Sequence, residues 1–238
     1  MKKLNKKHTI IINTMLVMTL LLVYIINFMP KTTLETYGKN TLTAIYNGNR
    51  SSNNVSLMFN VYENTKIVNS IIDVLDKKGV KATFFVGGCW ADDNLETLVR
   101  MVNSGHEIGN HGYFHKDHKK LSYNDNLQEI SNTSSVVKAL CGVEMNLFAP
   151  PSGSFSPNTL KASYDLGYKV IMWSKDTIDW RDSNTSIIYN RATKNLAGGD
   201  LVLMHPKEHT LEVLPSIIDY YISVGFDVVS VSQNIASI

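Results

Sequence analysis

The chain has 238 residues, a formal net charge of only +2, and 44% hydrophobic residues. This length suits one large domain built on a single core. The lysines are scattered and no basic stripe interleaves with aromatic residues, which argues against nucleic acid as a partner.

The N-terminal part of the chain is a basic tail followed by a long uncharged stretch. Residues 1–8 are rich in lysine, and residues 9–29 carry no charge. About 20 apolar residues are enough to cross a bilayer. The positive-inside bias then predicts a single-pass cell-membrane protein with a cytoplasmic tail and everything after the helix outside the cell. A cleaved signal peptide, which would leave a secreted protein, is the alternative, although its apolar core is usually only about 7–15 residues.

After this stretch the sequence becomes polar and then alternates between strand-like and helical patterns. Residues 30–53 are turn-rich and predict an extracellular linker. Helices are expected near 124–140, 156–167 and 210–224. The strand candidates are 55–59, 82–86, 107–109, 147–151, 168–173, 201–204 and 226–231. The alternation predicts an α/β domain over 54–238, with about seven β-α units around a parallel sheet or barrel.

Polar side chains follow several of these strands. In a parallel barrel, the residues just past the strands meet on one face. The polar residues in such positions are Asn60, His111, His115, Asp176 and His205. Their convergence predicts a metal or acid–base site. His111 and His115 are four residues apart, a spacing that on a helical turn lets both imidazoles bind one ion. A polar turn with incidental histidines is the alternative.

The remaining histidines and the cysteines predict no further site. His106 precedes an apolar segment and is expected to be structural, whereas His118, in KDHKK, is expected on a solvated face. Cys89 and Cys141 are too few for a disulfide framework and are expected as unpaired thiols, with pairing outside the cell as the alternative.

Five stretches of the sequence resemble motifs of the polysaccharide deacetylases with a NodB-homology domain, the fourth carbohydrate esterase family. These stretches are KATFFVGG (81–88), GHEIGNHGYFH (105–115), FAPPSG (148–153), WSKDTIDW (173–180) and LVLMH (201–205). The resemblance covers about residues 46–238 and implies a distorted (β/α)7-type barrel. It also implies a metal-dependent hydrolase that removes N-acetyl groups from an extracellular polysaccharide, peptidoglycan or a chitin-like glycan.

The resemblance implies roles for individual residues as well. His111 and His115 would bind a divalent metal, zinc above all, and His205 would be the catalytic acid with Asp176 as its partner. Trp180 would shape the substrate groove, with a core aromatic as the alternative. The implied substrate-binding residues are Asn60, Pro150, Pro151, Ser152 and Trp180, with the backbone N–H of Ser152 in the oxyanion hole.

The first motif departs from the family pattern. The family has Thr-Phe-Asp-Asp-Gly where this chain has MFNVY, so Asn60 stands in place of the base and Val61 in place of the third metal ligand. Ala149 stands where the family has an arginine that pairs with the base. A buried arginine without its carboxylate would cost several kcal/mol, so the two losses fit together.

Two functional hypotheses follow from these departures. Glu63 or Cys89 would serve as replacement ligand in a divergent metal-dependent deacetylase. Otherwise the chain is a catalytically silent relative that still binds glycan at the cell surface.

Overall fold

The computed structural model describes residues 7, 13–19 and 42–236 in two separate units, residues 1–41 and 42–238. In the first unit, residues 13–19 are helical. Most of the predicted membrane helix at 9–29 and most of the predicted tail at 1–8 lie outside the described residues. Within the residues that are described, no helix has both the length and the apolar content to span a membrane.

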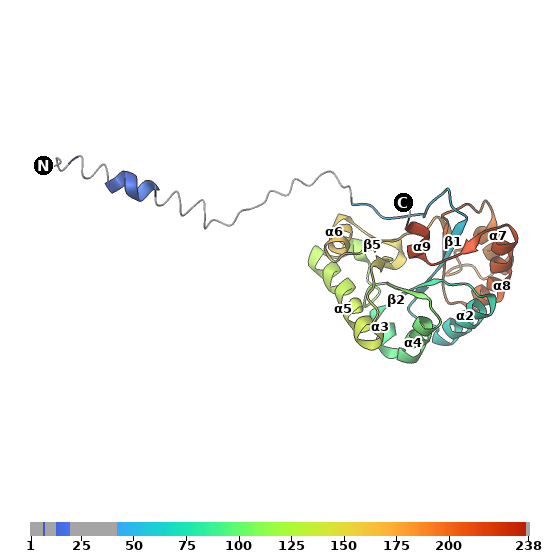
Figure 1. Ribbon diagram of the computed structural model, residues 1–238. Coiled ribbons are helices and arrows are strands. Elements are labelled where there is room, and N and C mark those ends of the chain that lie inside the picture. The colour runs from blue at the N-terminus through green and yellow to red at the C-terminus, as the bar shows by residue number, and fades with distance from the viewer. Residues whose placement is uncertain (1–6, 8–12, 20–41, 237–238) are drawn as a thin grey trace. The chain divides into compact units, whose positions relative to one another are not determined.

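The second unit is built on a parallel sheet (Figure 1). Its strands run in the order β5-β4-β3-β2-β1-β7-β6, with β8 paired to β1. The strands are β1 (Asn54–Val61), β2 (Thr83–Val86), β3 (Glu107–Asn110), β4 (Leu147–Phe148), β5 (Lys169–Val170), β6 (Lys175–Asp176), β7 (Leu201–Met204) and β8 (Asp227–Val228). In the described chain the two ends of this path, β5 and β6, do not pair with each other. The α/β class and the parallel strands are confirmed, and the sheet forms a half-barrel rather than a closed barrel.

Helices follow most strands and surround the sheet (Figure 1). They are α2 (Thr65–Lys78), α3 (Gly88–Asp93), α4 (Leu95–Asn103), α5 (Tyr123–Cys141), α6 (Pro157–Asp165), α7 (Thr185–Thr193), α8 (Glu208–Ser223) and α9 (Val231–Ile235), with short 3-10 turns η1 (His118–Lys120) and η2 (Pro151–Gly153). Local chemistry sets their ends. Ser156 and Thr159 form a capping box with Pro157 at the first turn of α6, and Gly79 ends α2 in the left-handed conformation that glycine adopts without strain.

The central strand β1 divides the interior into two sides. Leu57, Phe59 and Val61 join the cluster that packs the sheet against helices such as α2 and α8. Met58 belongs to a second cluster on the opposite side of the sheet. Because side chains alternate along a strand, Asn60 shares the side of Met58, which is the inner side of the half-barrel. This alternation decides which residue of the first motif reaches the site.

The domain begins earlier than the predicted boundary at residue 54. Ile45 forms a parallel bridge to Ile171, and Asn47 an antiparallel bridge to Asp200. Gly48 N–H donates to Gly199 O at 2.7 Å, and Arg50 makes a 2.6 Å ion pair with Asp200. Residues predicted to end the linker therefore span the open side of the sheet, because the unpaired edges there need hydrogen-bond partners.

The C-terminal third contains two further differences from the sequence prediction. The predicted strand at 226–231 is shortened to β8, because Ser230 caps a new helix, α9, through a capping box with Gln233. Helix α7 was not predicted, since its apolar face is short.

Candidate active site

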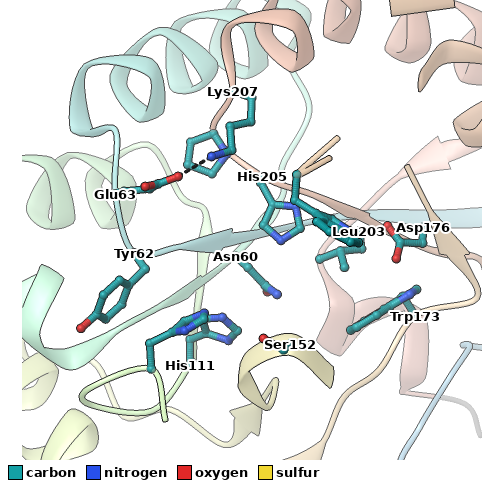
Figure 2. Close-up of a pocket in the computed structure, with 13 residues that line it drawn as sticks. Asn60, Tyr62, Glu63, His111, Ser152, Trp173, Asp176, Leu203, His205 and Lys207 are labelled. Carbon is teal, nitrogen blue, oxygen red and sulfur yellow. Dashed lines mark hydrogen bonds and ion pairs between the residues drawn. The ribbon is translucent and has the colours of Figure 1, made fainter. Parts of the chain in front are cut away.

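The site is a pocket of about 500 Å³ at the carboxyl ends of the strands. Its lining residues are Asn60, Tyr62, Glu63, His111, His115, Ser152, Trp173, Asp176, Trp180, Leu203, His205, Pro206 and Lys207. Figure 2 shows them converging from several elements of the sheet. The predicted convergence of the strand-end residues is confirmed, because all five polar residues of that prediction line this pocket.

His205 is held by the buried carboxylate of Asp179. Its Nδ1 lies 2.7 Å from Asp179 Oδ1, and its backbone N–H donates to Asp179 Oδ2 at 2.7 Å. Thr210 Oγ1 donates to the same Oδ2 at 2.6 Å. Burial alone would raise the pKa of Asp179, but the hydrogen bonds from His205 and Thr210 lower it below its usual value. The carboxylate therefore stays charged and fixes the His205 ring, which points into the pocket (Figure 2).

Asp176 is not the partner of His205, contrary to the prediction. It lines the pocket, but its Oδ1 accepts the backbone N–H of Ile178 at 2.8 Å. Ile178 has a φ of +54°, a left-handed conformation that costs a β-branched residue free energy. The Asp176 carboxylate thus supports the turn that delivers Asp179 three residues later. The sequence signal for the partner is the second aspartate of the motif, Asp179, directly before Trp180.

The two predicted metal-ligating histidines do lie together. The ring centroids of His111 and His115 are 5.1 Å apart. His111 is 1% exposed, and its Nδ1 lies 2.7 Å from Ala149 O, so Nδ1–H donates and Nε2 keeps its lone pair. Burial, followed by the neighbouring His115, lowers the pKa of His111 to about 3. Burial also lowers the pKa of His115, so both imidazoles are uncharged at neutral pH.

A loop rather than a helical turn brings these rings together. Residues 111–115 are not helical, and His115 itself has a φ of +54°. Buried Glu129 accepts the backbone N–H groups of Tyr113 and Phe114 at 2.9 and 2.8 Å. Its other oxygen pairs with Lys116 at 2.8 Å. Glu129 could not be predicted from the sequence, because it lies on α5, 15 and 16 residues from the N–H groups that it accepts, and leaves no local signal.

Tyr62 is a second residue that sequence reasoning missed. It stands where the family motif has glycine, and its ring centroid lies 5.0 Å from that of His115. Gly87 makes room for it, because a Cβ there would lie 2.3 Å from Tyr62 Cδ2. Burial raises the pKa of Tyr62. His111, His115 and Tyr62 therefore form a row of three rings that lines the pocket, with an edge-on contact between the two histidines and a tilted contact between His115 and Tyr62.

The donor set does not fit a catalytic zinc ion. Such sites usually supply three protein ligands. Val61 has no side-chain atom that can bind a metal. It is fully buried in the hydrophobic cluster between the sheet and the helices and does not line the pocket. Glu63 lines the pocket but forms an ion pair with Lys207 (Figure 2). Cys89 is not among the lining residues. Within the described part of the chain, no three His, Cys, Asp or Glu side chains are grouped to hold a metal.

The predicted substrate-binding residues divide into two sets. Asn60, Ser152 and Trp180 line the pocket, and Trp180 is 55% exposed rather than part of the core. Pro150 and Pro151 are buried and do not line the pocket, contrary to the prediction. They lead into η2, where Ser152 takes a φ of +55°. The prolines thus position Ser152, and Ser152 forms the pocket surface.

The other histidines and the cysteines lie elsewhere. His106 is buried, as predicted, and its Nδ1 accepts the Ala82 N–H at 3.3 Å. His118 was expected on a solvated face but is fully buried, with Nδ1 2.7 Å from Asn126 Oδ1, because α5 folds over it. Cys89 and Cys141 are both free thiols, and both are partly buried.

The chain belongs to the polysaccharide deacetylase family, which matches residues 47–171. The solved structure of BA3943 from Bacillus anthracis, a CE4-family pseudoenzyme, superposes with a TM-score of 0.79 at 32% identity, covering 82% of this chain and 69% of that one. A BA3943 mutant with restored enzymatic activity superposes equally well, at 31% identity, covering 82% of this chain and 71% of that one.

Curated relatives agree with this assignment. The uncharacterized protein YlxY of Bacillus subtilis is 32% identical over 189 residues, which are 79% of this chain and 59% of YlxY. A peptidoglycan-N-acetylglucosamine deacetylase of Bacillus cereus is 30% identical over 160 residues, or 67% of this chain and 58% of that protein. The chain thus spans less than two thirds of the length of these relatives.

Proposed function

We propose that this chain binds an N-acetylated glycan of the peptidoglycan class without hydrolysing it. One observation carries the proposal. The deacetylase pocket is retained with its histidines, while the positions of the base and of the third metal ligand hold Asn60 and a buried Val61. A carboxamide does not accept a proton at neutral pH, and an alkyl side chain binds no metal. The pocket keeps the means to hold a sugar and lacks the means to activate water.

Several side chains suit sugar binding. Trp180 offers an exposed aromatic face at the pocket, a shape that packs against the apolar face of a pyranose ring. His205, fixed by Asp179, and the Ser152 backbone offer polar groups from opposite sides (Figure 2). Pockets that bind small ligands combine such apolar walls with a few placed polar groups. The peptidoglycan class is supported by the relatives named as peptidoglycan deacetylases.

Metal-dependent N-deacetylation is the second candidate. The retained His111–His115 pair favours it, since glycan binding alone does not need two imidazoles placed to share a metal, whereas the His205–Asp179 pair suits both candidates. Hydrolysis with this donor set would require a third metal ligand in place of Val61, and Glu63 is the pocket-lining carboxylate nearest to Val61 in the sequence.

The two candidates differ in what happens to the acetyl group. The purified full-length chain is titrated with chitotetraose by isothermal calorimetry, and released acetate is measured with and without added zinc. We expect saturable binding with no acetate above the level without protein. Zinc-dependent acetate release that disappears in His111→Ala would instead establish deacetylation.

We also propose that residues 9–29 anchor the protein in the cell membrane with its domain outside. The proposal rests on the uncharged stretch and the preceding lysines alone. Protease treatment of intact cells tests it. Digestion of the domain, together with retention of the full-length chain in membranes washed with alkaline carbonate, is the expected result, whereas a shorter chain in the medium would indicate cleavage and secretion.

A further inference from the structure

Asp179 is held by one short segment of the chain, residues 205–210. Its carboxylate accepts three hydrogen bonds from this segment, two from His205 and one from Thr210. A fourth bond goes to its backbone, because the ring Nε2 of His209 lies 2.7 Å from Asp179 O. A carbonyl oxygen can only accept, so Nε2–H is the donor. His209 therefore binds the main chain of Asp179 and not its side chain.

The carbonyl that His209 binds belongs to the central peptide of a tight turn. Arg181 N–H donates to Ile178 O at 3.1 Å, which places Asp179 and Trp180 at the two middle positions of a four-residue turn. Trp180 is not among the described residues with a positive φ, so the peptide between Asp179 and Trp180 does not have the orientation of a type II turn. His209 thus anchors the one peptide plane whose rotation distinguishes the common turn types.

The orientation of this peptide also sets the direction of the Trp180 side chain. Rotation of the peptide changes ψ of Asp179 and φ of Trp180 together, and φ carries the Trp180 Cβ around the N–Cα bond. Trp180 lines the pocket, is 55% exposed, and makes no indole hydrogen bond within the described chain. The Arg181 guanidinium lies 5.8 Å from the ring centroid, but that side chain is itself exposed. The backbone is therefore what orients the indole.

We propose that His209 is a positioning residue for Trp180, the exposed aromatic wall of the pocket. The hydrogen bond from His209 Nε2–H to Asp179 O fixes the peptide before Trp180 and so holds the indole at the pocket. His209 itself does not line the pocket and acts through Trp180. The effect on sugar affinity rests on the proposed glycan binding, whereas the effect on the orientation of Trp180 does not.

Two amide substitutions at position 209 separate the reach of the donor from its presence. The side chain of His209→Gln can place its amide nitrogen close to the position of the ring Nε2 and donate to the same carbonyl. The side chain of His209→Asn is one methylene shorter and ends near the position of Nδ1. His209→Ala removes the donor altogether. The matched pair of amides therefore tests the bond to Asp179 O and not the polarity of the side chain.

The orientation of Trp180 is measured without any ligand. The full-length protein labelled with fluorotryptophan gives a fluorine resonance for each of its three tryptophans, and Trp180→Phe identifies that of Trp180. His209→Ala and His209→Asn should shift this resonance and leave that of Trp90 in place, while His209→Gln should keep the wild-type spectrum. The Nδ1–H proton resonance of His205 should stay unaltered in all three variants, because its partner is the carboxylate of Asp179.

A double-mutant cycle measures whether His209 changes affinity through Trp180. Calorimetric titration with chitotetraose should give about fivefold weaker binding for His209→Ala and His209→Asn, the loss expected for one hydrogen bond, and wild-type affinity for His209→Gln. In the Trp180→Ala background, His209→Ala should cause no further loss, because the ring through which it acts is gone.

Other results overturn the inference or the function beneath it. An unmoved Trp180 resonance in His209→Ala and His209→Asn, or equal shifts in the two amide variants, overturns the positioning role. Equal affinity losses with and without Trp180 overturn the claim that His209 acts through that ring. No binding of chitotetraose by wild type overturns the proposed function, while the fluorine spectra still decide the role of His209. Thermal melts select the folded variants, and the comparison of the two amides decides if His209→Ala is unfolded.

Discussion

His205 and Asp179 make two hydrogen bonds to each other, one through the imidazole Nδ1 and one through the backbone N–H of the histidine, each 2.7 Å long. The two bonds use different oxygens of the carboxylate, Oδ1 for the ring and Oδ2 for the backbone N–H. Thr210 donates a third hydrogen bond, to Oδ2. The pair is therefore a structural unit that joins the end of β7 to the turn after β6.

Asp179→Asn should destabilise the protein by about 2 kcal/mol at pH 7, since it removes a buried charge-assisted hydrogen-bond acceptor. The pKa of Asp179 is lower in the folded protein than in the unfolded chain, so its contribution is present above the unfolded pKa and is lost as the pH falls through the folded one. Urea denaturation should show a constant difference in the free energy of unfolding between wild type and Asp179→Asn from pH 5 to 8. This difference should narrow below about pH 4.

Asp176→Asn is the matched control for this variant. Its amide oxygen can still accept the Ile178 N–H, so we expect a change below about 0.5 kcal/mol and an unaltered Nδ1–H proton resonance for His205. Equal losses in the two variants would contradict the assignment of Asp179 as the partner.

His106 should make the protein less stable in mild acid. Burial, and next the charge of Lys81, lower the pKa of this histidine to about 4 in the folded state. Between the unfolded value near 6.5 and pH 4, only the unfolded chain binds the proton, so stability is full at high pH and falls with decreasing pH, by up to about 1.4 kcal/mol per unit. Urea denaturation should show that the free energy of unfolding falls less between pH 7.5 and pH 5 in His106→Gln than in wild type. An NMR titration that places this pKa above 6 would contradict the prediction.

Zinc should bind only weakly to the wild-type chain. Two neutral imidazoles form an incomplete ligand set, so we expect substoichiometric zinc after gel filtration of zinc-loaded protein. Glu63→Ala should leave the zinc content unchanged, because Lys207 holds that carboxylate, while His111→Ala should abolish what zinc there is. One retained zinc per chain that disappears in Glu63→Ala would mean that Glu63 is the third ligand.

Trp180→Ala should lower glycan affinity without lowering stability. Truncating an aromatic anchor at a binding site typically costs more than 1 kcal/mol, so we expect about tenfold weaker binding. Tyr164→Ala is the control, because Tyr164 is as exposed, at 56%, but lies on α6 outside the pocket. Calorimetric titration and thermal melts of both variants test this, and equal effects on binding would exclude a specific role for Trp180.

Much of the fold could be predicted because the signals are local. Apolar periodicity and caps located helices such as α5 and α6, and the strand ends located His111 and His205. The errors arose where distant contacts decide. His118 is buried because α5 covers it, although its neighbours in sequence are charged.

The site shows the same division. Residue types at motif positions predicted which side chains line the pocket, and Asn60, Ser152 and Trp180 do line it. Hydrogen-bond partners could not be read from spacing. Asp176 and Asp179 both lie far before His205 in the sequence, so spacing does not choose between them, and the left-handed turn at Ile178 makes the second of them the partner.

The segment at 45–50 determines where mechanical load would enter the domain. A pull on the chain from its N-terminal side reaches the Ile45 backbone bonds and the Arg50–Asp200 pair before it reaches β1. Asp200 is almost fully buried, so losing Arg50 would leave its carboxylate without that counterion, with only the more distant Lys175 beside it. Tension applied to the domain from its N-terminal side is thus resisted first by the Ile45 backbone bonds and by the Arg50–Asp200 pair, directly before β7.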